Sequence, residues 1–462
     1  MKTMALLKSC ITCLILSLLS ITCSSSSSPH KHFQILDVSA SLEQTRQIIS
    51  PNSSPTITNH QPPPSSSNSL SLTLIPRSSL PSATTTINNY TALTLSRLAR
   101  DQAHLQSLLS RLESPVKSGL SQDSGEYFAR VGIGRPAAQL YMTIDTGSDI
   151  TWLQCRPCLY CYPQSDPVFN PRASSTYKDL TCLSPQCVSL RASTCLAGGC
   201  LYQLLYGDGS ITTGDFATET ISFGTSGSVD NVAIGCGHGN IGLFSGAAGI
   251  MGLGGGNLSL SSQIKATSFS YCLVDRDSNS SSTLDFNSTR PADSVVAPLL
   301  RNPSTDVYRY VGMTGIRVGG EAVKFPASLL EMGSDGSGGV IVDSGTTVTR
   351  LRREVYGLVR DAFRNKTKEL PAAGGYSLFD TCYDLSSLSE ARIPTVAFEF
   401  GGGKTVALPA RNTVIPVDGG GKFCLALAGS GKLSIIGNVQ QQGMRVTYDF
   451  ANNFIAFSPN KC

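Results

Sequence analysis

Two segments of the sequence share one pattern, in which an apolar run ends in Asp and continues as a hydroxyl residue, Gly and a second hydroxyl residue. They are Met142-Thr143-Ile144-Asp145-Thr146-Gly147-Ser148 and Ile341-Val342-Asp343-Ser344-Gly345-Thr346-Thr347. A single Asp-Thr-Gly is typical of an ordinary turn whose Asp caps backbone amides. Two copies that lie 198 residues apart, each at the end of a predicted strand, are far more specific. The pattern indicates a duplicated unit that supplies one carboxylate from each copy.

The duplication extends past the two Asp residues. An apolar-apolar-Gly element follows each of them, with Gly252 lying 107 residues beyond Asp145 and Gly437 lying 94 residues beyond Asp343. From Gly125 onward, short apolar runs alternate with Gly-rich turns, a texture typical of β-structure. Such a body of about 340 residues is too large for one core. We therefore expect two β-rich lobes with the active site at their seam, and one packing helix near 354–363.

Histidine is scarce in this body, and that scarcity excludes several enzyme classes. Only His238 lies beyond residue 121, and between two glycines it reads as a surface turn. Ser–His–Asp and Cys–His hydrolases need an imidazole base, and catalytic zinc sites usually use His ligands. The chemistry is therefore expected to depend on carboxylates, with no metal and no cofactor.

The first 120 residues differ from the rest in composition. Residues 1–24 resemble a secretory signal peptide, and the Ser/Pro/Thr-rich stretch up to residue 90 is expected to bury no core. A basic amphipathic helix is predicted over 91–113. The net charge of +4 comes from this leader, because residues 121–462 hold 27 basic and 28 acidic side chains. The body gives no electrostatic case for nucleic-acid binding, and no later stretch is long enough for a membrane anchor.

Twelve cysteines follow the signal region, and an even number in a secreted chain predicts disulfides. Nine precede residue 300 and three follow it, so full pairing needs at least one bridge between the halves. We expect Cys382 to pair with Cys424, and Cys462 with Cys236 or Cys272. Zinc binding by the first three cysteines is the disfavoured alternative. The twelve are Cys155, Cys158, Cys161, Cys182, Cys187, Cys195, Cys200, Cys236, Cys272, Cys382, Cys424 and Cys462.

The sequence from Gly125 to Cys462 resembles the pepsin-type aspartic proteases, and more narrowly their plant nepenthesin-like group. The two Asp motifs carry the resemblance, and the Cys-rich stretch 155–200 resembles that group's disulfide-rich insertion. The resemblance implies a mainly β, bilobal, pepsin-like double-β-barrel fold with a few short helices, stabilised by disulfides. It implies a signal peptide at 1–24, a prosegment at 25–120, an N-terminal lobe at 121–300 and a C-terminal lobe at 301–462.

The resemblance also implies roles for individual residues. Asp145 and Asp343 would be catalytic. Thr146 and Ser344 would bond to each other across the seam, Ser148 and Thr346 would hold the outer carboxylate oxygens, and Gly147 and Gly345 would allow close approach. Tyr206 and Gly207 match the flap, a hairpin that closes over substrate, and Trp152 would support it. The alternatives are local turn capping for the hydroxyls and ordinary core packing for the aromatic residues.

The expected function is an acid endopeptidase that acts on proteins and peptides. We expect the protein to be a monomer and to be inhibited by pepstatin-like compounds. It is expected to reside in the secretory pathway or apoplast, with the ER lumen or vacuole as alternatives. A catalytically silent inhibitor or binding protein of the same fold is the alternative function. Pepsin-type zymogens place a basic prosegment residue near the carboxylates, and Arg97, Arg100 and Arg111 are the candidates. Glycosylation is expected at Asn279, Asn287 and Asn365, whereas Asn257 is expected to be inaccessible.

Overall fold

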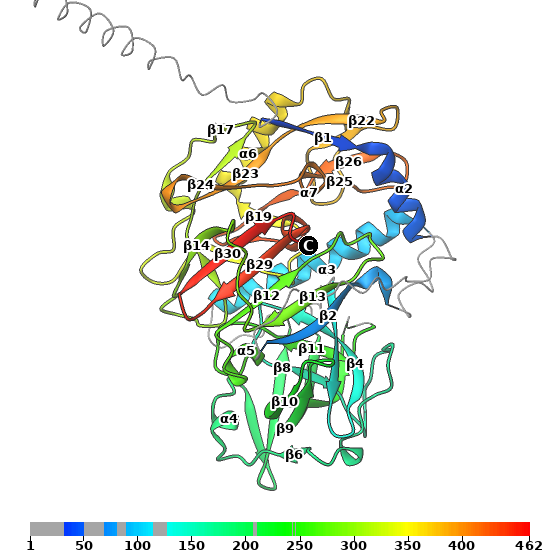
Figure 1. Cartoon of the computed structure of the whole chain (residues 1–462), viewed down its shortest axis with the longest axis vertical. Helices are drawn as coiled ribbons and strands as arrows, with labels where there is room; N and C mark the ends of the chain where they lie inside the picture. The colour runs from blue at the N-terminus through cyan, green and yellow to red at the C-terminus, as the bar shows by residue number, and fades with distance from the viewer. Residues whose placement is uncertain are drawn as a thin grey trace, which may run out of the picture.

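The computed structural model of the chain describes residues 32–49, 69–80, 89–113 and 127–462, apart from 207–209, 243 and 245. The described residues form two β-rich lobes, one drawn in green and one in yellow to orange, with the long leader helix α3 running between them (Figure 1). The expected mainly β, bilobal, pepsin-like architecture is confirmed. The signal-peptide prediction lies outside the described residues.

The N-terminal lobe is built on a closed ring of six strands. The order is β3-β4-β11-β5-β10-β9, and β9 returns to pair with β3. Strands β6, β7 and β8 extend this ring around β9. The bounds are β3 Tyr127–Ile133, β4 Ala138–Asp145, β5 Trp152–Gln154, β6 Lys178–Asp179, β7 Ser193–Leu196, β8 Gly199–Leu205, β9 Ile211–Ser222, β10 Ser228–Ile241 and β11 Gly249–Gly252.

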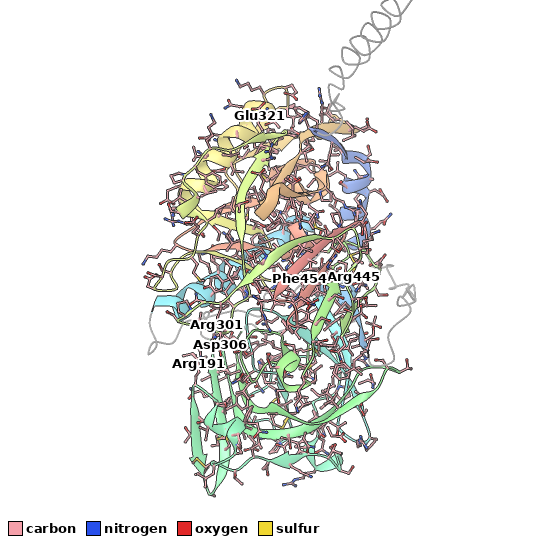
Figure 2. The ribbon with its side chains drawn as sticks, turned by 60° about the vertical axis from the view of Figure 1, so that its left-hand side comes forward. Arg191, Arg301, Asp306, Glu321, Arg445 and Phe454 are labelled. Atoms are coloured by element: carbon pink, nitrogen blue, oxygen red, sulfur yellow. A yellow bond between two sulfur atoms is a disulfide. The ribbon has the colours of Figure 1, made fainter. Side chains whose placement is uncertain are left out.

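A shared sheet joins the two lobes. Its order is β3-β2-β13-β12-β29-β30-β14, and strand β2 comes from the leader. Arg445 of β29 (Figure 2) donates to the Asp285 carboxylate (2.7 Å), whose other oxygen accepts from Ser71 of β2 (2.5 Å). The bounds are β2 Leu70–Pro76, β12 Ser268–Cys272, β13 Ser282–Phe286, β14 Val295–Leu300, β29 Met444–Asp449 and β30 Phe454–Pro459. Strands from before and after residue 300 thus interlock.

The C-terminal lobe continues from β14 through β15, β18, β28, β19 and β27. Two four-stranded sheets, β17-β16-β23-β24 and β20-β21-β26-β25, complete it. The bounds are β15 Tyr310–Val311, β16 Met313–Val318, β17 Glu321–Ala322, β18 Val340–Val342, β19 Thr349–Arg352, β20 Ala372–Ala373, β21 Cys382–Asp384, β22 Glu390–Pro394, β23 Val396–Phe400, β24 Lys404–Ala407, β25 Val414–Pro416, β26 Lys422–Leu425, β27 Leu427–Ser430 and β28 Ser434–Ile436.

The described helices are few, and most are short. The predicted helix over 91–113 lies within α3, and the helix predicted near 354–363 lies within α6, which buries Val355, Val359 and Phe363. The bounds are α2 Val38–Ile48, α3 Tyr90–Glu113, α4 Pro185–Val188, α5 Leu260–Gln263, α6 Arg353–Lys366, α7 Ala410–Thr413 and α8 Asn438–Gln441, with 3-10 turns η2 Arg77–Ser79, η3 Pro171–Ala173, η4 Ala327–Leu329 and η5 Gly401–Gly403.

The expectation that the leader before residue 90 buries no core is wrong. Strand β1 (Phe33–Asp37) pairs with β22, and β2 inserts between β3 and β13. Leu72 and Leu74 are buried in the shared sheet. Apolar and polar residues alternate over 70–74, which is the pattern of a half-buried strand. The polar composition of the surrounding leader obscured that short signal.

Six disulfides use all twelve cysteines of the described body. The pairing of Cys382 with Cys424 is confirmed, and Cys462 pairs with Cys272 rather than Cys236, which bonds to Cys155. The Cys272–Cys462 bridge joins the two halves, as the cysteine count requires. The remaining three bridges stabilise the 155–200 stretch: Cys158–Cys161, Cys182–Cys195 and Cys187–Cys200.

Because Leu74 is fully buried in the leader strand, Leu74→Ala should destabilise the precursor by about 2–5 kcal/mol. Ile35→Ala is the matched control, since Ile35 also lies in a leader strand but is 60% exposed, and it should change stability by less than about 0.5 kcal/mol. Thermal unfolding of the purified precursor and both variants measures the difference. Equal unfolding midpoints for the two variants would show that β2 is not an integral strand.

Candidate active site

The two Asp motifs occupy equivalent positions in the two lobes. Asp145 ends β4, which runs parallel to β11 so that Asp145 pairs with Gly252. Asp343 follows β18, which runs parallel to β28, and its N–H donates to the Ile436 carbonyl (3.1 Å). The apolar-apolar-Gly elements identified in the sequence are therefore the partners of the two Asp-bearing strands.

Thr146 and Ser344 bond to each other across the seam, as the resemblance implies. The Ser344 N–H donates to Thr146 Oγ1 (2.8 Å), and the Thr146 N–H donates to Ser344 Oγ (3.3 Å). Both side chains are buried. This reciprocal pair joins the backbone beside one Asp to the backbone beside the other.

Hydroxyl groups and amides hold each carboxylate. Ser148 Oγ donates to Asp145 Oδ2 (2.5 Å), and Thr346 Oγ1 donates to Asp343 Oδ2 (2.7 Å). The Gly147 N–H donates to Asp145 Oδ1 (2.8 Å), and the Gly345 N–H to Asp343 Oδ1 (3.2 Å).

The close approach of the two loops explains the two glycines. A Cβ at Gly147 would lie 3.1 Å from Asp343 Oδ1, and one at Gly345 would lie 3.0 Å from Asp145 Oδ1. A side chain at either position would crowd the opposite carboxylate. The two carboxylates therefore converge on one point at the seam.

Tyr206 and Trp152, which were predicted to form and support the flap, lie together in one buried aromatic cluster. Strands β8 and β9 form a hairpin, and the Tyr206 N–H donates to the Ser210 carbonyl (2.8 Å) next to its tip. The indole N–H of Trp152 donates to the Tyr206 hydroxyl, and Phe244 packs edge-on against both rings. Gly207 at the hairpin tip lies outside the described residues.

Helix α3 of the leader places a histidine on the paired carboxylates. His104 Nε2 lies 2.7 Å from Asp343 Oδ2, and ligand atoms of His104, Asp145 and Asp343 all lie within 4.8 Å of one another. Each of the three side chains is buried. Their donor types would suit a metal ion, but here His104 and Asp343 satisfy each other directly. The leader therefore occupies the point at which the two carboxylates meet.

The charges of this pair reinforce each other. Burial by itself would lower the pKa of His104, but the negative charge of Asp343 and its hydrogen bond raise that pKa to about 9. Burial likewise opposes ionisation of Asp343, yet the His104 cation holds the pKa of Asp343 below its ordinary value. At neutral pH the two form a buried ion pair in which the imidazolium N–H donates to the carboxylate.

The leader contact that the structure describes is made by His104, and the arginine candidates stay a prediction. Arg97 is buried but bonds to Asp277 (2.7 Å), which also accepts from the Tyr90 hydroxyl (2.5 Å). Arg100 donates to Ser96 of its own helix (2.5 Å). The side chain of Arg111 lies outside the described residues. The leader histidines were set aside because they precede the body, and only the docking of α3 brings one of them to the site.

Asp101 makes a second charged contact between α3 and the body. Its carboxylate accepts from the Arg350 guanidinium and from the Thr347 N–H. Asp101 and Arg350 are both almost completely buried, with exposed fractions of 0% and 2%. Because α3 carries Asp101 and His104 on one face, a turn apart, it engages Arg350 and Asp343 together.

His238 is not in a surface turn, contrary to the sequence-based expectation. It lies half-buried in β10, at a β-bulge between Gly237 and Gly239. One ring nitrogen contacts Asp215 Oδ2 (2.8 Å), and the other contacts the Pro157 carbonyl (2.8 Å). This contact fastens the Cys158–Cys161 loop to the N-terminal barrel.

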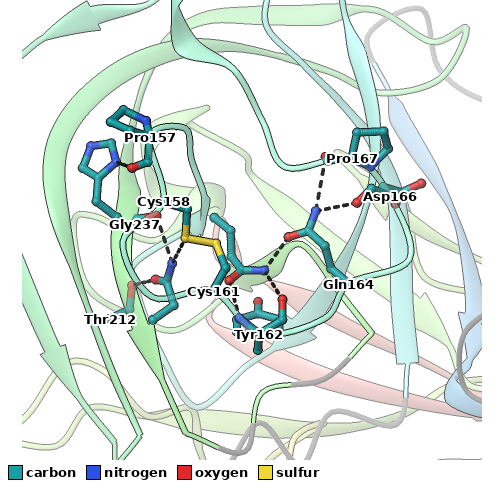
Figure 3. The surroundings of a disulfide bond; sticks show 12 residues. Pro157, Cys158, Cys161, Tyr162, Gln164, Asp166, Pro167, Thr212 and Gly237 are labelled. Atoms are coloured by element: carbon teal, nitrogen blue, oxygen red, sulfur yellow. Dashed lines mark hydrogen bonds between the residues drawn. A yellow bond between two sulfur atoms is a disulfide. The ribbon is translucent and has the colours of Figure 1, made fainter.

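Figure 3 shows the hydrogen bonds around the Cys158–Cys161 disulfide, including those of Tyr162 and Gln164. Gln154 of β5 donates to the Tyr162 carbonyl (3.0 Å) and to the Gln164 side chain (2.6 Å), and accepts from the Tyr162 N–H (3.0 Å). Tyr162 in turn contacts Phe244. The Cys-rich stretch therefore supports the aromatic cluster beneath Tyr206.

The expected glycosylation asparagines differ in exposure. Asn279 and Asn365 are exposed, Asn365 in α6, whereas Asn287 is half-buried and accepts from the Thr267 N–H (2.9 Å). Asn257 is exposed, so the expectation that it is inaccessible is wrong.

Sequence reasoning missed several residues that position the second Asp. Gln441 of α8 donates to the Asp343 carbonyl (3.2 Å), and Asn438 donates to the Ser344 carbonyl (3.0 Å). Both are buried. Both residues follow directly after the second apolar-apolar-Gly element. That position could have identified them, because polar side chains buried there need hydrogen-bond partners.

Comparisons with known proteins identify the family to which the chain belongs. Residues 127–287 match the family model described as xylanase inhibitor N-terminal, and residues 308–459 match that described as xylanase inhibitor C-terminal. The chain is 53% identical to Aspartyl protease family protein 2 of Arabidopsis thaliana (76% of this chain, 73% of that protein). It is 43% identical to Protein ASPARTIC PROTEASE IN GUARD CELL 2 of the same species (86% and 88%). It is 40% identical to Aspartic proteinase nepenthesin-2 of Nepenthes gracilis (79% and 83%).

Solved structures support the fold alone, because their sequences have diverged widely. The structure named edgp has a TM-score of 0.60 at 19% identity, covering 86% of this chain and 96% of that one. Basic 7S globulin from soybean has a TM-score of 0.58 at 18% identity, covering 85% and 96%. Among the described helices, none combines the length and apolar character needed to cross a membrane.

The His104–Asp343 pair should give the precursor a defined pH dependence of stability. Because the pKa of His104 is raised, its contribution to folding stability is fully present below its ordinary pKa of 6.5. That contribution is lost as the pH rises through about 9. Because the pKa of Asp343 is lowered, its contribution to stability is present above its ordinary pKa of 3.8 and is lost as the pH falls below that value. In an Asp145→Asn background, which is intended to prevent self-cleavage, His104→Gln should lower the thermal midpoint most between about pH 4 and 6.5.

The exposed Gln102 on the same helix provides the matched control, and Gln102→Ala should shift the midpoint little at any pH. A constant difference between His104→Gln and its parent from pH 3 to pH 10 would contradict the ion pair.

Proposed function

Because the chain belongs to the plant aspartyl protease family and is an aspartic endopeptidase, we propose that Asp145 and Asp343 activate water to hydrolyse peptide bonds of protein substrates at acidic pH. The observation that carries this proposal is the convergence of the two Asp loops on one point. Two carboxyls held this close cannot both ionise readily, so that one stays protonated while the other is ionised.

The chemistry follows from that shared proton. The ionised carboxylate takes a proton from a bound water, while the protonated carboxyl hydrogen-bonds the substrate carbonyl oxygen. The roles exchange when the tetrahedral intermediate collapses and the leaving amine receives a proton. The hydrogen bonds from Ser148 and Thr346 orient the carboxylates, and Tyr206 would exclude water when the hairpin closes over a bound peptide.

An inhibitor or binding protein of the same fold is the second candidate, favoured by the description of the two matching family models. Both Asp–hydroxyl–Gly motifs are complete in this chain, which supports the protease. Secretion into the apoplast, or retention in the ER lumen or vacuole, belongs to the proposal, as do the monomeric state, glycosylation and inhibition by pepstatin-like compounds.

Asp145→Asn and Asp343→Asn should each lower proteolysis at least about a hundredfold, because each removes one half of the acid–base pair. Cleavage of denatured haemoglobin near pH 4, with and without pepstatin, measures this. Asp361→Asn, in exposed Asp361 of α6, is the matched control and should cleave normally. Matured protein that shows no pepstatin-sensitive cleavage would favour the binding protein instead.

We further propose that residues 25–120 are a prosegment that keeps the precursor latent. Helix α3 covers the paired carboxylates, and three buried carboxylates hold it: Asp343 through His104, Asp101 through Arg350, and Asp277 through Arg97. Protonation of Asp343 and Asp277 in acid would break their ion pairs with His104 and Arg97 and weaken the attachment of the helix.

The precursor should therefore be inactive at neutral pH and lose its leader only below about pH 4, where carboxylates protonate. His104→Gln should shift leader release toward higher pH, whereas Gln102→Ala should leave it unchanged. N-terminal sequencing and peptide cleavage after incubation at stepped pH give both readouts. Full activity of an intact precursor at neutral pH would overturn the prosegment role.

A further inference from the structure

The contact between Asp101 and Arg350 differs from the other buried ion pairs of α3. When the leader leaves, Asp277 keeps a cation of the body beside it, because Arg276 Nε lies 3.8 Å from its carboxylate. Arg350 keeps none. Among the described residues, Asp101 is the only carboxylate within ion-pair distance of Arg350. Release of α3 would therefore leave Arg350 without its counter-ion on the surface that α3 had covered.

The surroundings of Arg350 have further unused hydrogen-bonding capacity. Within the described part of the chain, Arg350 Nε and Thr347 Oγ1 are buried without hydrogen-bond partners. The Thr347 N–H also loses its acceptor when Asp101 departs. The Arg350 guanidinium and the Thr347 N–H then both face the volume that the Asp101 carboxylate vacates. These donors suit a carboxylate, since an arginine matches its two oxygens and a buried, unpaired arginine is unfavourable.

The position of this site relative to the carboxylate pair follows from the helix. Asp101 and His104 are three residues apart on α3, which places their contacts about 4.5 Å apart along the helix axis. Because His104 contacts Asp343, it marks the proposed position of the scissile carbonyl. For a substrate that follows the path of α3, an advance of about 3.3 Å per residue in an extended chain would put Arg350 one or two residues from the scissile bond.

We propose that Arg350, with Thr347, forms a substrate subsite for an acidic side chain, so that the mature enzyme prefers peptides with Glu or Asp one or two residues from the cleaved bond. In this view the Asp101 side chain occupies the subsite of the precursor as a substrate carboxylate would. The inference rests on the proposed protease function and on release of α3. Arg350 acts in recognition and takes no part in the chemical step.

The test uses peptide pairs that differ only by Glu and Gln. Each peptide has apolar residues at the scissile bond. The Glu or Gln stands at one of the two nearest positions on one side of that bond, and a separate pair is made for each position on each side. At about pH 5, where Glu is ionised, the matured enzyme should show a kcat/KM for one Glu peptide that is about tenfold or more above its Gln partner.

Substitutions of Arg350 then assign the preference. In Arg350→Gln the Glu-to-Gln ratio should fall to near 1, and in Arg350→Lys it should be intermediate, because Lys keeps the charge but not the planar fork. Arg172→Gln removes the same charge from an exposed turn of the N-terminal lobe and should keep the full ratio. Because Arg350→Gln leaves Asp101 buried without its partner, Asp101→Asn/Arg350→Gln is prepared alongside it so that folding of the precursor is preserved.

A wild-type ratio near 1 at every position, or a ratio that survives in Arg350→Gln, would overturn the inference while cleavage of the Gln peptides still supports the protease.

If no peptide is cleaved, the protease proposal fails, and binding decides the inference separately. For this, a full-length Asp145→Asn chain is cut at a protease site engineered within 114–120. A labelled peptide of residues 90–113 should then exchange into the cut chain about tenfold more tightly than its Asp101→Asn form. Equal affinity of the two peptides would reject the carboxylate subsite.

Discussion

The reciprocal hydrogen bonds between Thr146 and Ser344 are the constraint on which the rest of the site depends. They join two loops that are 198 residues apart in sequence and belong to different lobes. Each loop carries one Asp, so the distance between the carboxylates is set by this contact and by the two glycines that allow it. Buried donors and acceptors of this kind are costly to leave unpaired, which holds the lobes in one relative position.

The leader completes this arrangement in the precursor. Its strand β2 fills a place in the shared sheet, and its helix α3 covers the seam with Asp101 and His104. An active site built from converging carboxylates has a concentrated negative charge, and a leader cation neutralises it. In the proposed mechanism, the same electrostatics that make the Asp pair chemically useful also make it a binding site for the leader, and acid would weaken that attachment.

Much of this could be predicted from local pattern. The duplicated Asp motifs, the apolar-apolar-Gly elements and the β texture each follow from short-range periodicity, and the structure places them as two β-rich lobes that meet at a seam. The leader strand β2 was missed because the polar composition of the surrounding leader obscured the alternation of apolar and polar residues over 70–74. His238 was misplaced because a Gly-flanked histidine has the local signature of a turn, whereas a bulge in β10 needs its neighbouring strand to be recognised.

The sequence by itself therefore determined the fold class, the two catalytic candidates and the need for a disulfide between the halves, because each is encoded in residue types and spacing. Only the tertiary structure decided that Cys272, not Cys236, bonds to Cys462, and that His104 meets Asp343. It also decided that Arg350 depends on the leader for its counter-ion. These are contacts between segments far apart in the chain, and their partners are selected by the packing of α3 and the sheets rather than by any local signal.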